Sequence, residues 1–374
     1  YEISACLVGS EMCIRDSVAL VLTGGLLYAD HYLTGKMTTD DDFDSLSASD
    51  LHQTATEADG RLEREERFSE ALSGLEEQLA DLPSFTEVDR YLLSNNDIPA
   101  EALAKLDTGK APRSSYLSSD ASKIQVFVLF GLDGVDSSDS VMLVALDRVH
   151  QKIKLISLAR DSYVFIPEYG FFSKLAYSYT WGGAAMAVKN LNYNYYLNVS
   201  DYIAVDFDQL AEIIDRIGGV TVNIDEDEAR YLSNYPNVHV GDCLLDGETA
   251  VSYARIRKSS ATDSDRKRTG RQREVILSIL NTLQTMPLSQ YPGFVRDCLG
   301  MCATSFEAET LLTMAAETLG QNYTVEQYFF PEGQVDWWAG LIKEYFYYVY
   351  DLRRASDRIY RIIYEELYIS GYDD

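Results

Sequence analysis

A stretch of basic residues between Tyr253 and Arg273 is the part of this sequence best suited to bind a charged ligand. It contains eight lysines and arginines and two aspartates: Arg255, Arg257, Lys258, Arg266, Lys267, Arg268, Arg271, Arg273, Asp263 and Asp265. The whole chain, by contrast, carries a net charge of -27. Most of these basic residues are arginines, whose planar guanidinium groups bind pairs of phosphate oxygens. The stretch therefore predicts a site for a phosphate-bearing ligand, with a solvated basic loop as the alternative.

Two spacings within this stretch predict how the arginines are aimed. Arg255 and Arg257 alternate in a run that resembles a β-strand, so both side chains are expected on one face. Arg268 and Arg271 stand three residues apart at the entry to a predicted helix that continues to Met286, so they are expected to share a face of that helix.

A loop rich in aspartate and serine follows the predicted strand 125–130. Asp133 and Asp139 flank it, separated by glycine, valine, aspartate and serine. Carboxylates at such spacing suit a hard cation, Mg²⁺ or Mn²⁺, with phosphate completing the coordination shell. The same residue types also form ordinary turns, which is the alternative interpretation.

Two further segments carry charged residues where predicted elements end or begin. Arg160 and Asp161 follow the predicted strand 152–158, as a ligand site or as a local ion pair. Lys174 and Tyr179 precede Gly182 and Gly183, just before a predicted helix. A helix N-terminus preceded by lysine and glycines favours an anion, although a glycine cap alone has the same sequence.

The elements that must position these residues alternate along the chain. Apolar runs predict strands at 125–130, 141–146, 152–158, 202–206, 220–224 and 324–330. Helices are predicted at 184–191, 207–217, 245–254, 271–286 and 351–367. This alternation predicts an α/β fold, with a central mixed β-sheet flanked by helices.

The N-terminal third has a different composition. Residues 1–17 resemble a translated sequencing-adaptor tail, so they are excluded from the fold prediction. Residues 18–36 contain an apolar run shorter than the roughly 20 residues that span a bilayer, which we interpret as a partial transmembrane helix or as a signal-peptide core. Residues 37–121 are predicted to be a solvated stalk with short helices, and 122–374 the main domain.

Composition argues against two other classes of function. A sequence pI near 4.4 is opposite to the basic surface of a nucleic-acid-binding protein, so no nucleic-acid partner is expected. The chain has five cysteines and four histidines and lacks a Cys-x-x-Cys pair, which argues against zinc. Cys298 and Cys302, one helical turn apart, are expected to be buried thiols.

Taken in order, these motifs resemble the LytR-CpsA-Psr family of cell-envelope transferases. The matching stretches are Leu-Phe-Gly-Leu-Asp at 129–133, Ser-Asp-Ser at 138–140, Ser-Leu-Ala-Arg-Asp-Ser-Tyr at 157–163, Lys-Leu at 174–175, Tyr179 with Gly-Gly at 182–183, Ile-Gly-Gly-Val-Thr-Val at 217–222, Leu-Asp-Gly-Glu-Thr-Ala at 245–250, Tyr-Ala-Arg-Ile-Arg at 253–257, and Asp265, Arg268, Arg271 and Gln272. They cover about 124 to 280.

The resemblance implies Mg²⁺-dependent transfer of a glycopolymer, such as teichoic acid or capsule, from a polyprenyl pyrophosphate carrier to a peptidoglycan hydroxyl. It also implies a bacterial single-pass membrane protein with its domain outside the cytoplasm. The implied metal ligands are Asp133 and Asp139; the implied phosphate clamp is Arg160, Arg255, Arg257, Arg268 and Arg271; the implied substrate contacts are Lys174, Tyr179 and Gln272. Asp161 or Asp265 would accept the acceptor's proton or, as we favour, orient an arginine.

Two departures from the family pattern keep a second function open. Ser137 stands where the family usually has an arginine, and Ala176 where it has an asparagine. The loss of one phosphate ligand favours a non-catalytic envelope sensor that binds polyprenyl pyrophosphate lipids. The retention of Asp133 and Asp139 favours the enzyme.

Overall fold

The structure, a computed structural model, describes residues 119–364 except 134–137, 170, 258–260, 288–289, 320–322, 332–336 and 343–344. The predicted adaptor-like segment, partial membrane helix and stalk lie outside these residues, apart from the short helix η2 (Ser119–Lys123). Among the residues that are described, no helix has the length and apolar character needed to cross a bilayer.

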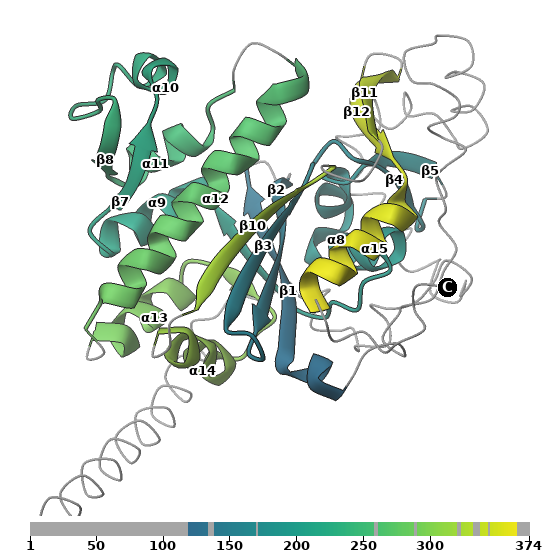
Figure 1. Ribbon diagram of the computed structural model, residues 1–374, viewed down its shortest axis with the longest axis horizontal. Coiled ribbons are helices and arrows are strands. Elements are labelled where there is room, and N and C mark those ends of the chain that lie inside the picture. Colours follow the sequence, from purple (N-terminus) through teal and green to yellow (C-terminus); the bar gives the residue numbers. More distant parts are fainter. Residues whose placement is uncertain are drawn as a thin grey trace, which may run out of the picture.

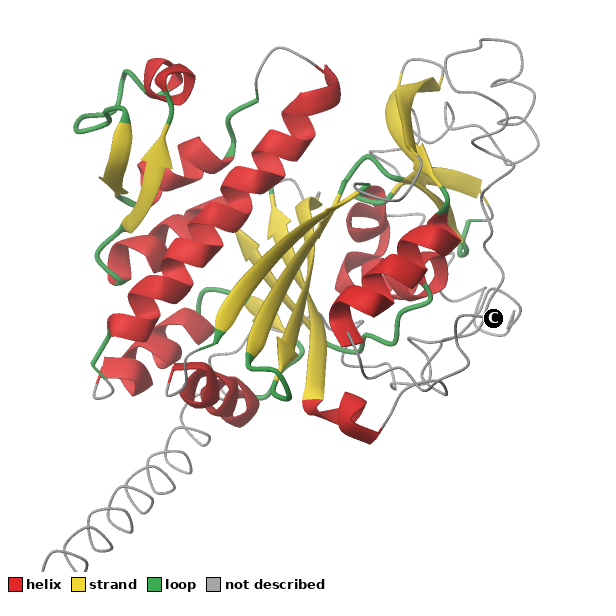
Figure 2. Ribbon diagram, in the orientation of Figure 1, coloured by secondary structure: helices red, strands yellow, loops and turns green. Residues whose placement is uncertain are grey.

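A six-stranded mixed sheet forms the centre of the molecule (Figures 1 and 2). Its strands, in spatial order, are β10 (Thr324–Phe330), β3 (Lys152–Leu158), β2 (Ser138–Asp147), β1 (Ile124–Leu132), β6 (Tyr202–Asp206) and β9 (Ala303–Thr304). The strands β1, β2 and β3 are antiparallel, whereas β10 pairs parallel to β3 and β6 parallel to β1. The predicted central mixed sheet is therefore confirmed.

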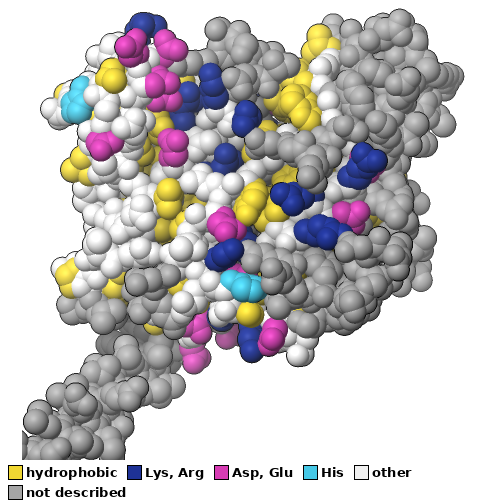
Figure 3. Space-filling view, viewed as in Figure 1, with side chains coloured by type: hydrophobic (Ala, Val, Ile, Leu, Met, Phe, Trp, Pro, Cys, Tyr) yellow, Lys and Arg dark blue, Asp and Glu magenta, His cyan; other side chains and the backbone are white. Residues whose placement is uncertain are grey.

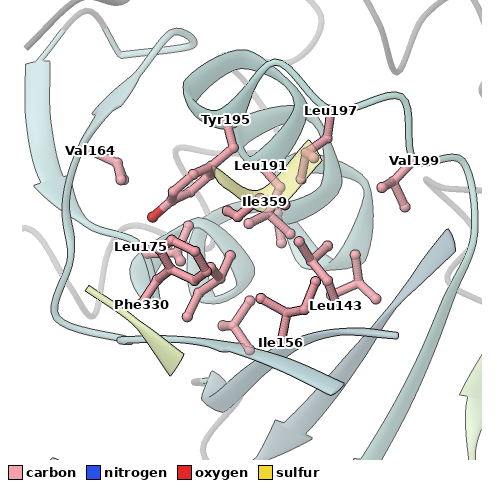
Figure 4. Close-up of a cluster of buried hydrophobic side chains, with 14 of the residues drawn as sticks. Leu143, Ile156, Val164, Leu175, Leu191, Tyr195, Leu197, Val199, Phe330 and Ile359 are labelled. Carbon is pink, nitrogen blue, oxygen red and sulfur yellow. The ribbon is translucent and has the colours of Figure 1, made fainter. Parts of the chain in front are cut away.

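Two helices cover one face of this sheet, α8 (Tyr177–Tyr195) and α15 (Leu352–Tyr364). Their apolar side chains meet those of the strands in a buried cluster that includes Leu143, Ile156, Leu191 and Ile359 (Figure 4). The predicted helix behind the glycines is longer than expected. It begins at Tyr177 and is interrupted at 182–183, where a φ of 60° requires a glycine.

The opposite face packs against α12 (Ala261–Thr285) and α14 (Ala308–Leu319), with α13 (Tyr291–Leu299) beside them. Met142 and Leu155 of the sheet share a buried cluster with Phe306 and with Ile276 of α12. The long helix predicted from 271 thus begins ten residues earlier, at Ala261. Helices on both faces complete the α/β arrangement predicted from the alternating pattern.

A lobe with its own small core lies on the α12 side of the sheet (Figure 1). It consists of α9 (Phe207–Arg216), β7 (Val220–Ile224), α10 (Glu226–Tyr231), β8 (Gly241–Leu245) and α11 (Gly247–Ala254). The helix predicted at 245–254 begins only at 247, because Asp246 caps its N-terminus by accepting a hydrogen bond from the Thr249 N–H. The lobe core, including Tyr253, packs against Val275 of α12.

Two hairpins complete the described fold: β4 (Tyr163–Ile166) with β5 (Phe171–Lys174), and β11 (Trp337–Ile342) with β12 (Tyr345–Tyr350). The β12 strand lies beside β4, because the Tyr348 N–H donates to the Asp161 carbonyl at 2.9 Å. Residues 347–350 of β12 are buried in the same cluster as Leu143 and Ile156 of the sheet, so this C-terminal hairpin shares the core of which Figure 4 shows a part.

Candidate functional site

The site is built around the Asp139 carboxylate at one edge of the sheet. Asp139 is the second residue of β2, and the antiparallel register places Val141 opposite Leu158, the last residue of β3. Arg160, two residues beyond that strand, therefore reaches the same edge, and its Nη1 donates a hydrogen bond to Asp139 Oδ1. The strand pairing that forms the sheet thus brings together two predicted ligand residues.

Two more arginines reach the same oxygen from the side of α11 and α12. Arg257 Nη2 lies 3.5 Å from Asp139 Oδ1, and Arg268 Nη1 lies 3.6 Å from it. The two differ in exposure: 53% of the Arg257 side chain is accessible, but only 2% of Arg268. Arg268 therefore forms the wall of the site, and Arg257 is the arginine that is open to a ligand.

Among the described side chains around Asp139, three guanidinium groups face one carboxylate. Burial, and then the neighbouring guanidinium groups of Arg160 and Arg268, lower the pKa of Arg257, whereas the Asp139 carboxylate raises it. Arginine nevertheless stays protonated in proteins, so the like charges remain close together. On the face shown in Figure 3, lysine and arginine side chains gather over the N-terminal half of α12, the half that carries Arg268. Such a concentration of cations suits an anion with several phosphate oxygens.

Asp161 forms ion pairs with two basic residues of the site, Lys174 and Arg160. Its Oδ1 lies 2.8 Å from Lys174 Nζ, and its Oδ2 lies 3.7 Å from Arg160 Nε. The Lys174 ammonium also lies 5.6 Å from the centroid of the Tyr347 ring and 5.9 Å from that of Tyr177. Asp161 thus contacts both Arg160 and Lys174, and its predicted role in orienting an arginine remains a prediction.

The backbone around Arg160 and Asp161 is held by hydrogen bonds from three directions. The Ala176 N–H donates to the Arg160 carbonyl at 3.0 Å, and the Ala159 N–H donates to the Phe330 carbonyl at 2.8 Å. Together with the bond from Tyr348, they connect the loop to the N-terminal cap of α8, to β10 and to β12. The loop is thereby fixed in place before any ligand binds.

Asp139 retains one oxygen that is suited to a metal ion. All three arginine contacts involve Oδ1, and within the described residues Oδ2 accepts no hydrogen bond. Asp133 follows the last residue of β1 and is partly exposed. No group of three or more His, Cys, Asp or Glu ligands occurs in the described part of the chain. Mg²⁺ in proteins is commonly held by one or two carboxylates, with water and phosphate completing its coordination, so Asp139 and Asp133 are ligands of the kind that this ion uses.

Arg255 does not lie where the sequence predicted. The strand expected from Arg255 onward is wrong: α11 ends at Ala254, as predicted, and Arg255 caps it in a helical conformation. The Arg255 guanidinium consequently stacks over Phe207, 4.4 Å from the ring centroid, while Arg257 faces Asp139. The two arginines do not share a face, because a helix end followed by a turn rotates successive side chains differently from a strand.

Arg271 also differs from its predicted position. It lies one turn further along α12 than Arg268, but it is buried and donates from Nε to Glu228 Oε1 at 2.7 Å. Its Nη1 donates to the Ile256 carbonyl at 3.1 Å. The guanidinium therefore binds protein groups of the lobe, whereas Arg268 faces Asp139.

The remaining predicted residues have varied surroundings. Tyr179 is buried in the sheet core, with its ring 5.0 Å from that of Phe130. Gln272 lies on α12 and is half-buried. Asp265 also lies on α12, but its side chain falls outside the described residues. These positions do not test the roles that the family resemblance implies.

Two residues of the site region were not predicted, Glu228 and Tyr347. Glu228 had a recognisable signal, because Asp225 and Glu228 have the spacing of a capping box, and each accepts a hydrogen bond from the other's N–H at 2.7–2.9 Å. Tyr347 had none, since only the fold brings β12 next to Lys174.

The fold and the site together define an α/β protein with an arginine-surrounded carboxylate at one edge of a mixed sheet. The model of the LytR_cpsA_psr family matches residues 96–359, so the chain belongs to this family.

Two relatives with different names are similar to this chain over part of its length. A polyisoprenyl-teichoic acid--peptidoglycan teichoic acid transferase TagU of Enterococcus faecalis is 30% identical over 166 residues, which cover 42% of this chain and 54% of that protein. A protein of Staphylococcus aureus called regulatory protein MsrR is 31% identical over 184 residues, covering 46% of this chain and 54% of its own. The chain thus spans about half the length of these relatives.

Solved structures share the fold at low sequence identity. TagT bound to LI-WTA has a TM-score of 0.55 and 19% identity, covering 68% of this chain and 99% of that one. YwtF (TagT) with bound octaprenyl pyrophosphate lipid has a TM-score of 0.52 and 17% identity, with coverage of 68% and 99%.

Proposed function

We propose that this protein transfers a glycopolymer from a polyprenyl pyrophosphate carrier to a peptidoglycan hydroxyl group. The observation that carries the proposal is the convergence of three arginines on Asp139 at one edge of the sheet. A pyrophosphate is the chemical group that such a cluster fits. Support also comes from the relatives named teichoic acid transferases and from a related structure with bound octaprenyl pyrophosphate lipid.

The reaction breaks the phosphoanhydride bond of the pyrophosphate and forms a phosphoester bond to the acceptor. The acceptor hydroxyl oxygen attacks the phosphorus attached to the glycopolymer, the bond from this phosphorus to the bridging oxygen breaks, and polyprenyl phosphate leaves with the bonding electron pair. The hydroxyl proton passes to a base. Arg160, Arg257 and Arg268 neutralise the charge that develops on the phosphate oxygens. Asp161, already paired with Lys174, orients the cations.

We include Mg²⁺, or Mn²⁺, in the proposal. Asp139 and Asp133 would hold it, with water and the phosphates of the substrate completing its coordination. When bound, the ion would lower the cost of charge on the leaving phosphate.

We also propose a bacterial cell-membrane location, with the domain outside the cytoplasm and the segment 18–36 as part of an anchor. The proposed carrier is a membrane lipid and the proposed acceptor is peptidoglycan, so the domain would act at the outer surface of that membrane. Protease treatment of intact protoplasts tests this location: the domain should be digested while a cytoplasmic marker survives.

A turnover assay distinguishes the proposed enzyme from the alternative, a lipid-binding sensor. Purified protein is mixed with a lipid-linked glycopolymer, Mg²⁺ and peptidoglycan fragments, and released polyprenyl phosphate is quantified. The enzyme releases it in multiple turnovers and attaches polymer to peptidoglycan. A protein that binds the lipid without release would instead support the sensor, a role in keeping with the name of the relative MsrR.

A further inference from the structure

The ion pair between Glu228 and Arg271 joins the lobe to α12, and Arg271 also bonds the carbonyl of Ile256, the residue before Arg257. Arg271 Nε and Glu228 Oε1 are 2.7 Å apart, with only 5% and 9% of their side chains exposed. Opposite charges buried this deeply require full hydrogen bonding to offset the loss of water. The other hydrogen-bond partners of Glu228 and Arg271 therefore indicate the role of this ion pair.

Glu228 is fixed by its own helix. Its Oε2 accepts the Asp225 N–H at 2.9 Å, while Asp225 accepts the Glu228 N–H at 2.7 Å. Both carboxylate oxygens are thus engaged, one by the start of α10 and one by Arg271. The carboxylate is a rigid acceptor, not a mobile surface group.

Arg271 connects the fixed Glu228 carboxylate to the turn after α11. Its Nη1 donates to the Ile256 carbonyl at 3.1 Å, and its guanidinium lies 5.9 Å from the centroid of the Tyr253 ring. Ile256 is completely buried, and its N–H donates to the Tyr253 carbonyl at 3.2 Å. Ile256 is therefore held at its carbonyl, at its N–H and by its side chain.

Arg257 is the next residue, and its direction depends on that turn. The carbonyl held by Arg271 belongs to the peptide group that leads into Arg257, whose side chain is half-exposed and lies 3.5 Å from Asp139. We propose that Glu228 and Arg271 are positioning residues, which fix the Ile256 peptide and thereby aim Arg257 at the phosphates of the substrate. That Arg257 binds the phosphates of the substrate rests on the proposed function. That Glu228 and Arg271 fix the Ile256 peptide is independent of it.

The first test needs no ligand. Hydrogen exchange is measured at the amides of Arg255 and Ile256 in Glu228→Gln, in Arg271→Lys and in the control Arg230→Ala, which removes an exposed ion pair on the same helix. Exchange is expected to accelerate at least tenfold in the first two variants and to stay unchanged in the control and in the strands of the sheet. Unchanged exchange at Ile256 in both variants would overturn the proposal.

The second test separates positioning from stability. In Glu228→Met combined with Arg271→Met, an apolar pair replaces the buried ions, so the protein is expected to fold and melt close to the wild-type temperature. Its affinity for geranylgeranyl pyrophosphate with Mg²⁺ should still fall about tenfold, the effect of one charge-assisted hydrogen bond. Wild-type affinity in this well-folded variant would contradict positioning.

A double-mutant cycle identifies the residue through which the pair acts. In an Arg257→Ala background, Glu228→Gln should have no further effect on affinity, because its target is gone. Additive losses would show that the pair acts elsewhere. If the wild-type protein binds no geranylgeranyl pyrophosphate, the proposed lipid is wrong, and the exchange measurement alone decides the positioning role.

Discussion

Arg257 Nη2 lies 3.5 Å from Asp139 Oδ1, although the two residues are 118 positions apart in the sequence. Asp139 belongs to the central sheet, and Arg257 follows the last helix of the lobe. The contact therefore forms only when the lobe docks beside the sheet. The site therefore depends on two separate hydrophobic cores, that of the sheet and that of the lobe.

Removal of the Asp139 carboxylate should abolish turnover without unfolding the protein. In Asp139→Asn the amide keeps the side-chain shape but loses the charge, so Mg²⁺ loses a ligand and three arginines lose their common acceptor. Mg²⁺-stimulated release of polyprenyl phosphate should fall at least 100-fold, on the order of two lost charge-assisted interactions. Asp133→Ala should also abolish Mg²⁺ stimulation. Full activity in both variants would refute the metal assignment.

Arg255→Ala should have little effect on the affinity for a pyrophosphate lipid. The Arg255 guanidinium stacks over Phe207, and an exposed cation–π contact contributes only about 0.5–1 kcal/mol to stability. The melting temperature should therefore fall slightly while affinity stays within about threefold of wild type. A loss of affinity as large as that of Arg257→Ala would mean that Arg255 turns toward the ligand.

A buried network at the other end of the sheet should make stability depend on Asp147. This fully buried carboxylate lies 3.1 Å from the equally buried Lys154 ammonium and accepts hydrogen bonds from His150. Burial pushes the pKa of Asp147 up, but the hydrogen bonds from His150 and the Lys154 contact outweigh it, so the pKa lies below its usual value. The group therefore stabilises the fold above its unfolded-state pKa of about 3.9, and this contribution is lost as the pH falls through the lower folded-state pKa.

Asp147→Asn should lower the free energy of unfolding at pH 7 by about 3–5 kcal/mol, because it leaves the Lys154 charge buried without its counter-ion. Denaturant titrations at pH 7 and pH 3 measure this loss, which should shrink at the lower pH. Asp227→Asn, which breaks the exposed pair with Arg230, is the matched control and should change stability by less than about 1 kcal/mol. Equal effects of the two substitutions would contradict the account of the buried network.

The thiols of Cys298 and Cys302 should be unreactive in the folded protein. Burial raises the pKa of Cys298 to about 12 and that of Cys302 to about 11. Since the thiolate is the reactive form, alkylation by iodoacetamide at pH 8 should be far slower in native than in unfolded protein. Mass spectrometry after timed quenching measures the labelling. Equal rates in native and denatured protein would contradict this expectation.

The sequence predicted the sheet well because its strands are continuous apolar runs. The predicted strands at 125–130, 141–146 and 152–158 all lie within β1, β2 and β3. Residues buried on both faces of a sheet have few alternatives to a strand, so the local pattern and the fold agree. The predicted domain boundary near 122 and the N-terminal segments remain predictions.

The orientation of the arginines was harder to predict, because it depends on contacts between distant elements. The alternation around Arg255 and Arg257 fits a strand locally, but Asp246 starts a helix whose end turns the two side chains apart. Arg268 and Arg271 share a helix, yet Glu228 in the lobe binds only the second. Whether an arginine faces the ligand site or binds other protein groups therefore depends on its contacts in the folded protein. Residue type and spacing in the sequence do not decide it.

The most direct measurement of the central claim is the affinity of four proteins for geranylgeranyl pyrophosphate with Mg²⁺ at one fixed salt concentration: wild type, Arg257→Ala, Arg257→Lys and Lys267→Ala. A charge-assisted hydrogen bond contributes roughly 1.5–3 kcal/mol, so Arg257→Ala should weaken binding about tenfold to a hundredfold. Arg257→Lys should restore it only in part, because lysine lacks the planar fork. Lys267→Ala, which removes an exposed cation of α12, should bind like wild type. Equal losses in Arg257→Ala and Lys267→Ala would show a diffuse basic surface and contradict a built phosphate site.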